Sequence, residues 1–262
     1  ALARLQALDR SALPPPERLN AAVLEGQLQD ELTAREFGLE RIPILADDGF
    51  HLALAQLPRQ MPFATPADYQ RYLARLRAIP GYVDQNVAHL RRGLRDGFTQ
   101  SRAALAGYEH GISSHVVADP ETSAFYEPFR IFPPGVPETA REALRAAGRA
   151  AIREAVVPAY ARFLDFFVRE YRPGARASTG CADLPRGREL YARLVRGYTT
   201  LPVTPDEVHA TGLAEVARIR AEMQAVMRKA GFEGELPAFL KHLREEPRFY
   251  ARTPEELSLI HI

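Results

Sequence analysis

A helix with a well-defined start at Thr204 limits the folds open to this chain. Thr204 supplies a capping hydroxyl, Pro205 fits the first helical position, and Glu207 can reach back to the cap backbone. Gly231 suits the left-handed residue that ends a helix. Between these signals, apolar side chains recur at helical spacing, at Val208, Val216, Ile219, Met223 and Val226, with Gly212 on the same face. The pattern predicts a helix over 204–231 with one apolar face.

Similar signals along the rest of the chain predict a mainly α, multi-helix fold. Thr65-Pro66-Ala67-Asp68 repeats the cap-then-proline start, and Pro80-Gly81 indicates a corner between two helices. Pro158 lies inside a long periodic stretch, where the ring clashes with the preceding turn and predicts a kink. The expected helices cover 17–37, 66–79, 82–97, 100–117, 138–171, 188–198, 204–231 and 235–243, with another beginning at 253.

One segment favours β structure. Asp47-Asp48-Gly49 separates Ile42, Ile44 and Leu45 from an alternating run of Phe50, Leu52 and Leu54. An Asp-Gly pair between apolar runs is typical of a hairpin turn, although Pro43 limits the first arm to an edge. We therefore expect one short β-hairpin in an otherwise helical chain.

Composition excludes several classes of function. With 262 residues and 46% hydrophobic content, the chain can bury a large core, as one domain or as two closely packed ones. The net charge is +1 and no basic block is present, so nucleic-acid binding is not supported. No apolar run reaches the ~20 residues of a membrane span. The single cysteine, Cys181, leaves the compartment undetermined: cytoplasmic and periplasmic or secreted locations stay open.

Several ordered motifs resemble the DUF885 family of bacterial proteins. They read GRELYARLVRGYTTLPVTPDEVHATGLAEVARIRAEM, RFYARTPEEL, GFHLALAQLP, ADYQRYLARLRAIPGYVDQNVAHLR and FYEPF. That family is similar to helical zinc metallopeptidases of the carboxypeptidase type. The resemblance implies a zincin-like helical half-domain, with zinc and a His-Glu-x-x-x-Gly-His-like motif in a part that would follow residue 262. It implies that residues 1–262 form a single helical region, an internal fragment of a larger DUF885-like domain, with 257–262 as a foreign tail.

The histidines offer no metal motif. None of the seven lies in HExxH, and the nearest pair, His110 and His115, is five residues apart, so its members diverge by about 140° on a helix. We therefore assign no catalytic residue and no metal ligand, and no cofactor in this chain; zinc is implied only for the full-length parent. The candidates for a substrate cleft are Tyr198 and Thr199 in the polar turn, His209 in the following helix, and His51 just after the hairpin turn.

Two functions remain open. In the first, the chain is the non-catalytic N-terminal or central part of a zinc metallopeptidase-like protein, forms one wall of a cleft for a peptide-like substrate, and is inactive alone. In the second, it is a helical scaffold or interaction module without enzymatic activity. A metal motif in the reading frame beyond Leu257 would favour the first function, and a stop codon there would favour the second.

Overall fold

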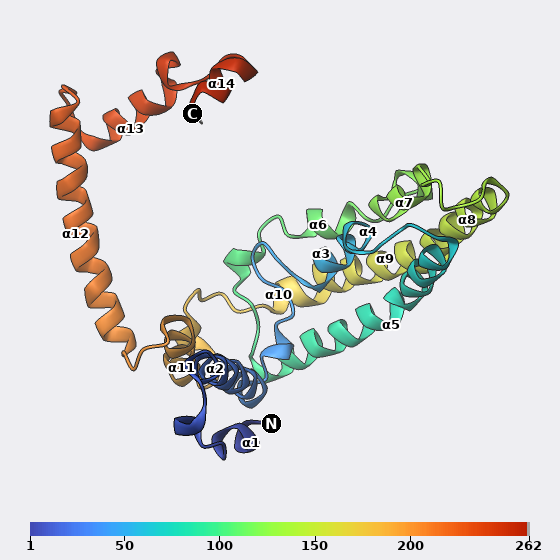
Figure 1. Ribbon diagram of the computed structural model, residues 1–262, viewed down its shortest axis with the longest axis horizontal. Helices are drawn as coiled ribbons and strands as arrows, with labels where there is room; N and C mark the ends of the chain where they lie inside the picture. Colours follow the sequence, from blue (N-terminus) through green and yellow to red (C-terminus); the bar gives the residue numbers. More distant parts are fainter. Residues whose placement is uncertain (261–262) are drawn as a thin grey trace. The chain divides into compact units, whose positions relative to one another are not determined.

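The computed structural model describes residues 1–260 and confirms a mainly α fold (Figure 1). Within those residues no β-sheet forms; the only β pairing is two isolated bridges. None of these helices combines the length and apolar character needed to cross a membrane. The α-helices are α1 (Leu2–Gln6), α2 (Pro15–Phe37), α3 (Phe50–Ala55), α4 (Leu57–Gln60), α5 (Pro66–Asp96), α6 (Glu109–Ser113), α7 (Glu127–Arg130), α8 (Glu138–Ala151), α9 (Val157–Phe166), α10 (Arg172–Gly174), α11 (Gly187–Thr199), α12 (Pro205–Lys229), α13 (Leu236–Glu245) and α14 (Pro254–Ile260).

The chain divides into two compact units, Ala1–Thr200 and Leu201–Ile262. The expectation of a single helical fragment of a larger domain stays a prediction. Of the tail expected to be foreign, residues 261–262 lie outside the described part of the chain.

Both sequence-based helix starts are confirmed. Thr65 at α5 and Thr204 at α12 each form a capping box, in which the threonine and the acid three residues later satisfy each other's backbone. At α12 the Glu207 carboxylate accepts from the Thr204 amide at 2.7 Å, while the Glu207 amide donates to Thr204 Oγ1 at 3.2 Å. The helix start at Thr204 is therefore stabilised by local hydrogen bonds that the sequence alone predicts.

The expected β-hairpin is wrong. A bridge between Ile44 and Gly49 closes the turn, and the Leu45 amide donates to the Asp48 carbonyl at 2.8 Å. Beyond the turn, Phe50–Ala55 forms α3 instead of a strand. Three alternating apolar residues are too few to separate the strand period from the helix period, and burial of the adjacent Phe50 and His51 side chains favours the helix here.

Two other helix predictions need correction, at Pro80 and at a loop. Helix α5 runs without a break through Pro80, because Ile79 and Val83 on either side are both buried in the core. The segment predicted as a helix over 100–117 contains only a 3₁₀ turn, Arg102–Leu105, and the short helix α6.

Pro158, where the sequence predicts a kink, follows a π-helical turn, Ile152–Val156, that is closed by the Val157 amide donating to the Ile152 carbonyl. A second π-turn, Phe167–Tyr171, is closed by the Arg172 amide and is followed by Pro173. A proline cannot donate to the carbonyl four residues back and its ring crowds that carbonyl, so a wider preceding turn accommodates it.

The main core of the first unit lies between α5 and α9, which run side by side (Figure 1). Tyrosine hydroxyls in this core hold the irregular segments: Tyr69 donates to the Pro128 carbonyl at 3.1 Å and Tyr72 to the Phe125 carbonyl at 2.9 Å. The aromatic side chains of 121–137 are therefore core anchors, since Phe125 and Phe129 are fully buried.

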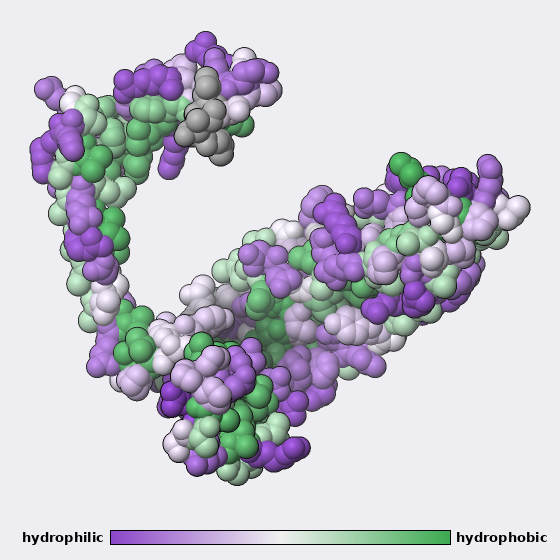
Figure 2. Space-filling view, in the orientation of Figure 1, coloured by the Kyte–Doolittle hydropathy of each residue, from purple (hydrophilic) through white to green (hydrophobic). Residues whose placement is uncertain are grey.

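In the second unit, the apolar face of α12 is exposed. Val216, Ile219 and Val226 are exposed, and Figure 2 shows apolar side chains gathered along this helix. Only Met227 at its end is buried, close to the turn where Phe232 packs on Phe239 with ring centres 5.1 Å apart. The spacing of apolar residues in α12 thus predicts that the helix has an apolar face, but it does not predict which segment packs against that face.

Candidate functional site

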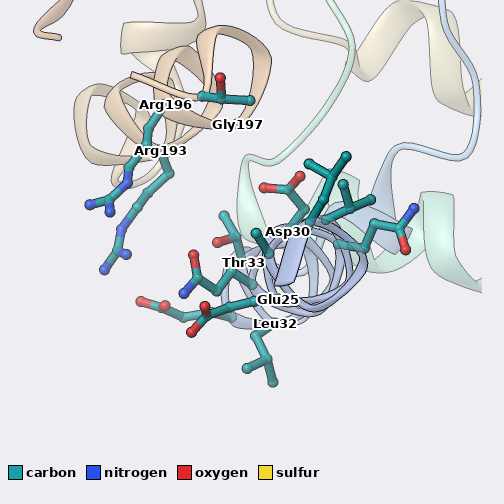
Figure 3. Close-up of a pocket in the computed structure, with 15 residues that line it drawn as sticks. Glu25, Asp30, Leu32, Thr33, Arg193, Arg196 and Gly197 are labelled. Carbon is teal, nitrogen blue, oxygen red and sulfur yellow. The ribbon is translucent and has the colours of Figure 1, made fainter. Parts of the chain in front are cut away.

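An open groove of about 990 Å³ lies between α2 and α11 in the first unit (Figure 3). Helix α2 contributes one side of it, and Arg193, Arg196 and Gly197 of α11 contribute the other. The groove is lined by Leu19, Ala22, Val23, Glu25, Gly26, Gln27, Gln29, Asp30, Leu32, Thr33, Glu36, Arg193, Arg196, Gly197 and Thr200.

Two glycines determine how closely α11 packs against its neighbours. A Cβ atom on Gly197 would lie 2.9 Å from Oδ1 of Asp30 in α2. A Cβ atom on Gly187, at the start of α11, would lie 2.0 Å from the carbonyl oxygen of Cys181. Because both positions lack a side chain, α11 approaches α2 and the preceding loop closely.

A small apolar cluster and an ion pair close the base of the groove. Phe37 of α2 packs with Leu184 and Leu190 in a buried cluster separate from the main core. Arg186 lies over the Phe37 ring at 4.4 Å and pairs with Glu36 at 2.6 Å. Hydrogen bonds to Glu189 and then Glu36 raise the pKa of Arg186 above its ordinary value.

The charges of the groove are unevenly paired. Glu25 accepts hydrogen bonds from Gln6 at 3.0 Å and from Arg10 at 2.6 Å, which lower the pKa of its carboxyl. Glu36 is held by Arg186. By contrast, Arg193 and Arg196 are exposed and have no carboxylate within ion-pair distance in the described part of the chain. The groove therefore offers two guanidinium groups outside any ion pair among the described residues, although the charge of Arg193 also acts on the carboxylate of Glu189.

A second, smaller hollow of about 290 Å³ adjoins the groove and shares Asp30, Thr33, Arg193 and Gly197 with it. Its remaining lining is Ala34, Leu39, Leu194 and Tyr198. Tyr198 is 89% exposed, which is unusual for an aromatic side chain and places its ring at the rim. This hollow has the character of a site for one apolar side chain.

Of the four sequence-predicted cleft residues, Tyr198, Thr199 and His51 belong to the first unit and His209 to the second. Tyr198 lies at the rim of the smaller hollow, and the adjacent Thr199 is half-buried, with its hydroxyl donating to the Val195 carbonyl at 2.7 Å. His209 is exposed on α12 in the second unit. His51 is 1% exposed in the main core. Only Tyr198 therefore lines a hollow. Arg193, Arg196 and Asp30 were not identified from the sequence. The signal that could have pointed to the two arginines is their spacing of three residues near the end of a predicted helix.

His51 lies in an aromatic environment without a hydrogen-bond partner on either ring nitrogen. Its ring centre is 5.2 Å from that of Tyr108 and 5.5 Å from that of Phe163. Burial, then the nearby His115, lowers the pKa of His51 to about 4, against a smaller opposing effect of Asp48. His115, against Phe125 and Tyr160, also has a pKa lowered by burial. At neutral pH both histidines are uncharged core residues.

The residues present do not fit a bound zinc ion. In the part of the chain that the structure describes, no three His, Cys, Asp or Glu side chains converge closely enough to hold a metal. Cys181 is half-buried, burial raises the pKa of its thiol, and its Sγ lies 3.8 Å from the Gly187 carbonyl. We derive no chemical step through a metal or this thiol.

The sequence over residues 1–258 matches the family model described as "Bacterial protein of unknown function (DUF885)". The chain belongs to the DUF885 family. Among curated proteins, nothing matches this DUF885 chain. Among solved structures, it is similar to a candidate lipoprotein from Colwellia psychrerythraea, with a TM-score of 0.70 and 21% identity. That similarity covers 81% of this chain and 37% of the other, so the DUF885 chain shares its fold with little more than a third of that structure.

Proposed function

We propose that this chain is the non-catalytic, N-terminal to central part of a zinc metallopeptidase-like protein of the carboxypeptidase type. In this proposal the groove between α2 and α11 forms one wall of a cleft for a peptide-like substrate. The observation that carries it is the groove itself: an open channel with a mixed polar and apolar lining and two guanidinium groups outside any ion pair in the described part of the chain, adjoined by a hollow with an exposed tyrosine. A peptide offers main-chain hydrogen-bonding groups as well as apolar and charged side chains, so a lining of this mixed kind suits it.

Zinc and the water it activates would belong to another part of the parent protein. The donor side chains of this chain do not converge, and the two most buried histidines are occupied by aromatic packing. The role left to this chain is to bind and orient the substrate. Membership of DUF885 over residues 1–258, together with the resemblance of that family to helical zinc peptidases, supports this division of labour.

The test compares this chain with the protein encoded by the whole reading frame that contains it. We expect the whole protein to bind zinc in a 1:1 ratio and to hydrolyse short peptides, and the 262-residue chain to do neither. In the whole protein, Tyr198→Ala should raise KM with little change in kcat, because Tyr198 would contact substrate equally in the ground and transition states. Arg188→Ala, on an exposed part of α11 outside the groove, is the matched control.

Two results would overturn the proposal. Stoichiometric zinc in this chain that is lost on His110→Ala or His209→Ala would place the metal site here. A whole protein that is folded and zinc-loaded yet hydrolyses no peptide would remove the peptidase function.

The exposed apolar face of α12 favours a second candidate, a helical interaction module without enzymatic activity. A whole protein that lacks zinc and forms a stable complex through α12 would support it.

A further inference from the structure

We propose that the groove between α2 and α11 binds an extended acidic peptide segment, whose side-chain carboxylates pair with Arg193 and Arg196. The inference extends the proposed function. It rests on that function in one respect: both take the groove as the site where the peptide binds. It does not require that the peptide be cleaved.

Arg193 and Arg196 form a pair suited to carboxylates. Residues three apart on a helix have Cβ atoms about 5–6 Å apart on one face, and Figure 3 shows both side chains extending from α11 on the groove side. Like charges at this spacing repel each other, and no carboxylate in residues 1–260 lies within ion-pair distance of either guanidinium. A ligand carboxylate would remove that repulsion and form charge-assisted hydrogen bonds.

The other acids of the groove do not cancel this charge. Glu25 and Glu36 are engaged by Arg10 and Arg186, respectively. Asp30 has no ion pair in the described part of the chain, which leaves two guanidinium groups against one carboxylate. Asp30 lines both the groove and the smaller hollow, where its oxygens can accept a main-chain N–H of a bound peptide.

The length of the groove favours a segment over a single chain end. From Leu19 to Glu36, α2 rises about 26 Å at 1.5 Å per residue. An extended peptide of about seven or eight residues covers that length. A free amino acid or one terminal carboxylate would fill only a small part of it.

Apolar walls define the rest of the ligand. Leu19, Val23 and Leu32 are 65%, 53% and 50% exposed along the α2 side. The smaller hollow adds a site for one more side chain beside Arg193. Since successive side chains of an extended peptide point to opposite sides, acidic and apolar residues should alternate in a good ligand.

The test measures binding of a nine-residue peptide, blocked at both ends, in which Asp and Leu alternate and one Leu is replaced by Trp. The protein contains no tryptophan, so the emission of the peptide reports binding directly. We expect the Asn-for-Asp peptide to bind at least about tenfold more weakly, and affinity for the acidic peptide to fall with added salt.

Charge reversal provides the decisive variant. Arg193→Glu combined with Arg196→Glu should weaken the acidic peptide at least about tenfold and strengthen a Lys-for-Asp peptide. Arg188→Glu, on the same helix but outside the groove, should leave both affinities unchanged. Because all three arginines are exposed, circular dichroism should show equal folding of the variants.

Three results would overturn the inference: equal affinity for the acidic and amide peptides, no effect of the double charge reversal, or binding only when the C-terminus of the peptide is free. The last result would assign the groove to a chain end. The outcome is separable from the proposed function. If the whole protein binds the acidic peptide but has no peptidase activity, only the proposed function is refuted. If the whole protein hydrolyses peptides and the charge reversal has no effect, only this inference is refuted.

Discussion

The guanidinium of Arg186, just before α11, lies 2.6 Å from the carboxylate of Glu36 near the end of α2. The two residues are 150 positions apart in sequence, so this contact fixes one end of the groove through tertiary structure. Arg186 makes it from a left-handed backbone conformation, with φ at 55°. Such a conformation is costly for a residue with a Cβ atom.

Replacing Arg186 should separate these two effects. Arg186→Ala removes the ion pair and the contact with Phe37 but keeps the strained backbone, so the midpoint of thermal unfolding should fall. Arg186→Gly removes the same contacts and relieves the strain, so its midpoint should fall less. Thermal unfolding by circular dichroism measures both, and an equal or larger fall for the glycine variant would contradict the backbone argument.

Gly187 and Gly26 should respond oppositely to alanine. Gly187→Ala places a Cβ atom 2.0 Å from the Cys181 carbonyl, so the loop before α11 must move, and we expect a loss of about 2 kcal/mol or more. Gly26, inside α2, has no atom within 4 Å of the equivalent position. Gly26→Ala should therefore stabilise the protein by about 0.5–1 kcal/mol. Urea unfolding tests both, and a neutral Gly187→Ala would refute the close approach.

His51 should make stability depend on pH. Its pKa is lowered from 6.5 to about 4 in the folded protein, so the unfolded chain binds more protons between these values. The free energy of unfolding should therefore fall as pH drops from 6.5 towards 4, by at most about 3 kcal/mol from this residue. His51→Leu should flatten the profile, leaving the part due to His115. Urea unfolding at several pH values decides, and identical slopes for His51→Leu and the unmodified chain would disprove the assignment.

The exposed face of α12 should cause self-association at high concentration. Ile219 is 44% exposed in an apolar row with Val216 and Val226. Ile219→Lys interrupts that row, and the new ammonium can pair with Glu215 and Glu222 on the same helix. Ala221→Lys adds the same charge about 200° around the helix as a control. Sedimentation should show less association for the first variant only; a monomer at every concentration without any substitution would argue against the expectation.

Local signals allowed much of the fold to be predicted. The capping boxes at Thr65 and Thr204 are made of neighbouring residues, so their geometry is already present in the sequence. Pro80 was misread because burial of Ile79 and Val83 outweighs one lost helical hydrogen bond. The hairpin prediction failed because tertiary burial of His51, whose carbonyl accepts from Tyr160 at 2.6 Å, determines the structure after the turn.

The candidate site was less accessible from the sequence. Tyr198 was identified from a polar turn, and it does line a hollow. The groove, however, depends on α2 and α11, which are separated by about 150 residues in the chain and meet through Gly197 and Asp30. Hydrophobic period predicts that a helix has an apolar face, but the partner of that face is decided by packing between distant segments.

The π-turns before Pro158 and Pro173 have a consequence for how this segment can vary in length. In a π-turn the backbone hydrogen bond joins an amide to the carbonyl five residues back, so the turn contains one residue more than an α-helical turn. The regular helix before and after the turn keeps the same side of the helix towards the core. Deleting one residue from Ile152–Val156 would restore an ordinary turn but would bring the ring of Pro158 against the carbonyl four residues back. Each π-turn is therefore tied to the proline that follows it, and a one-residue deletion in either turn should destabilise the helix unless that proline is replaced as well.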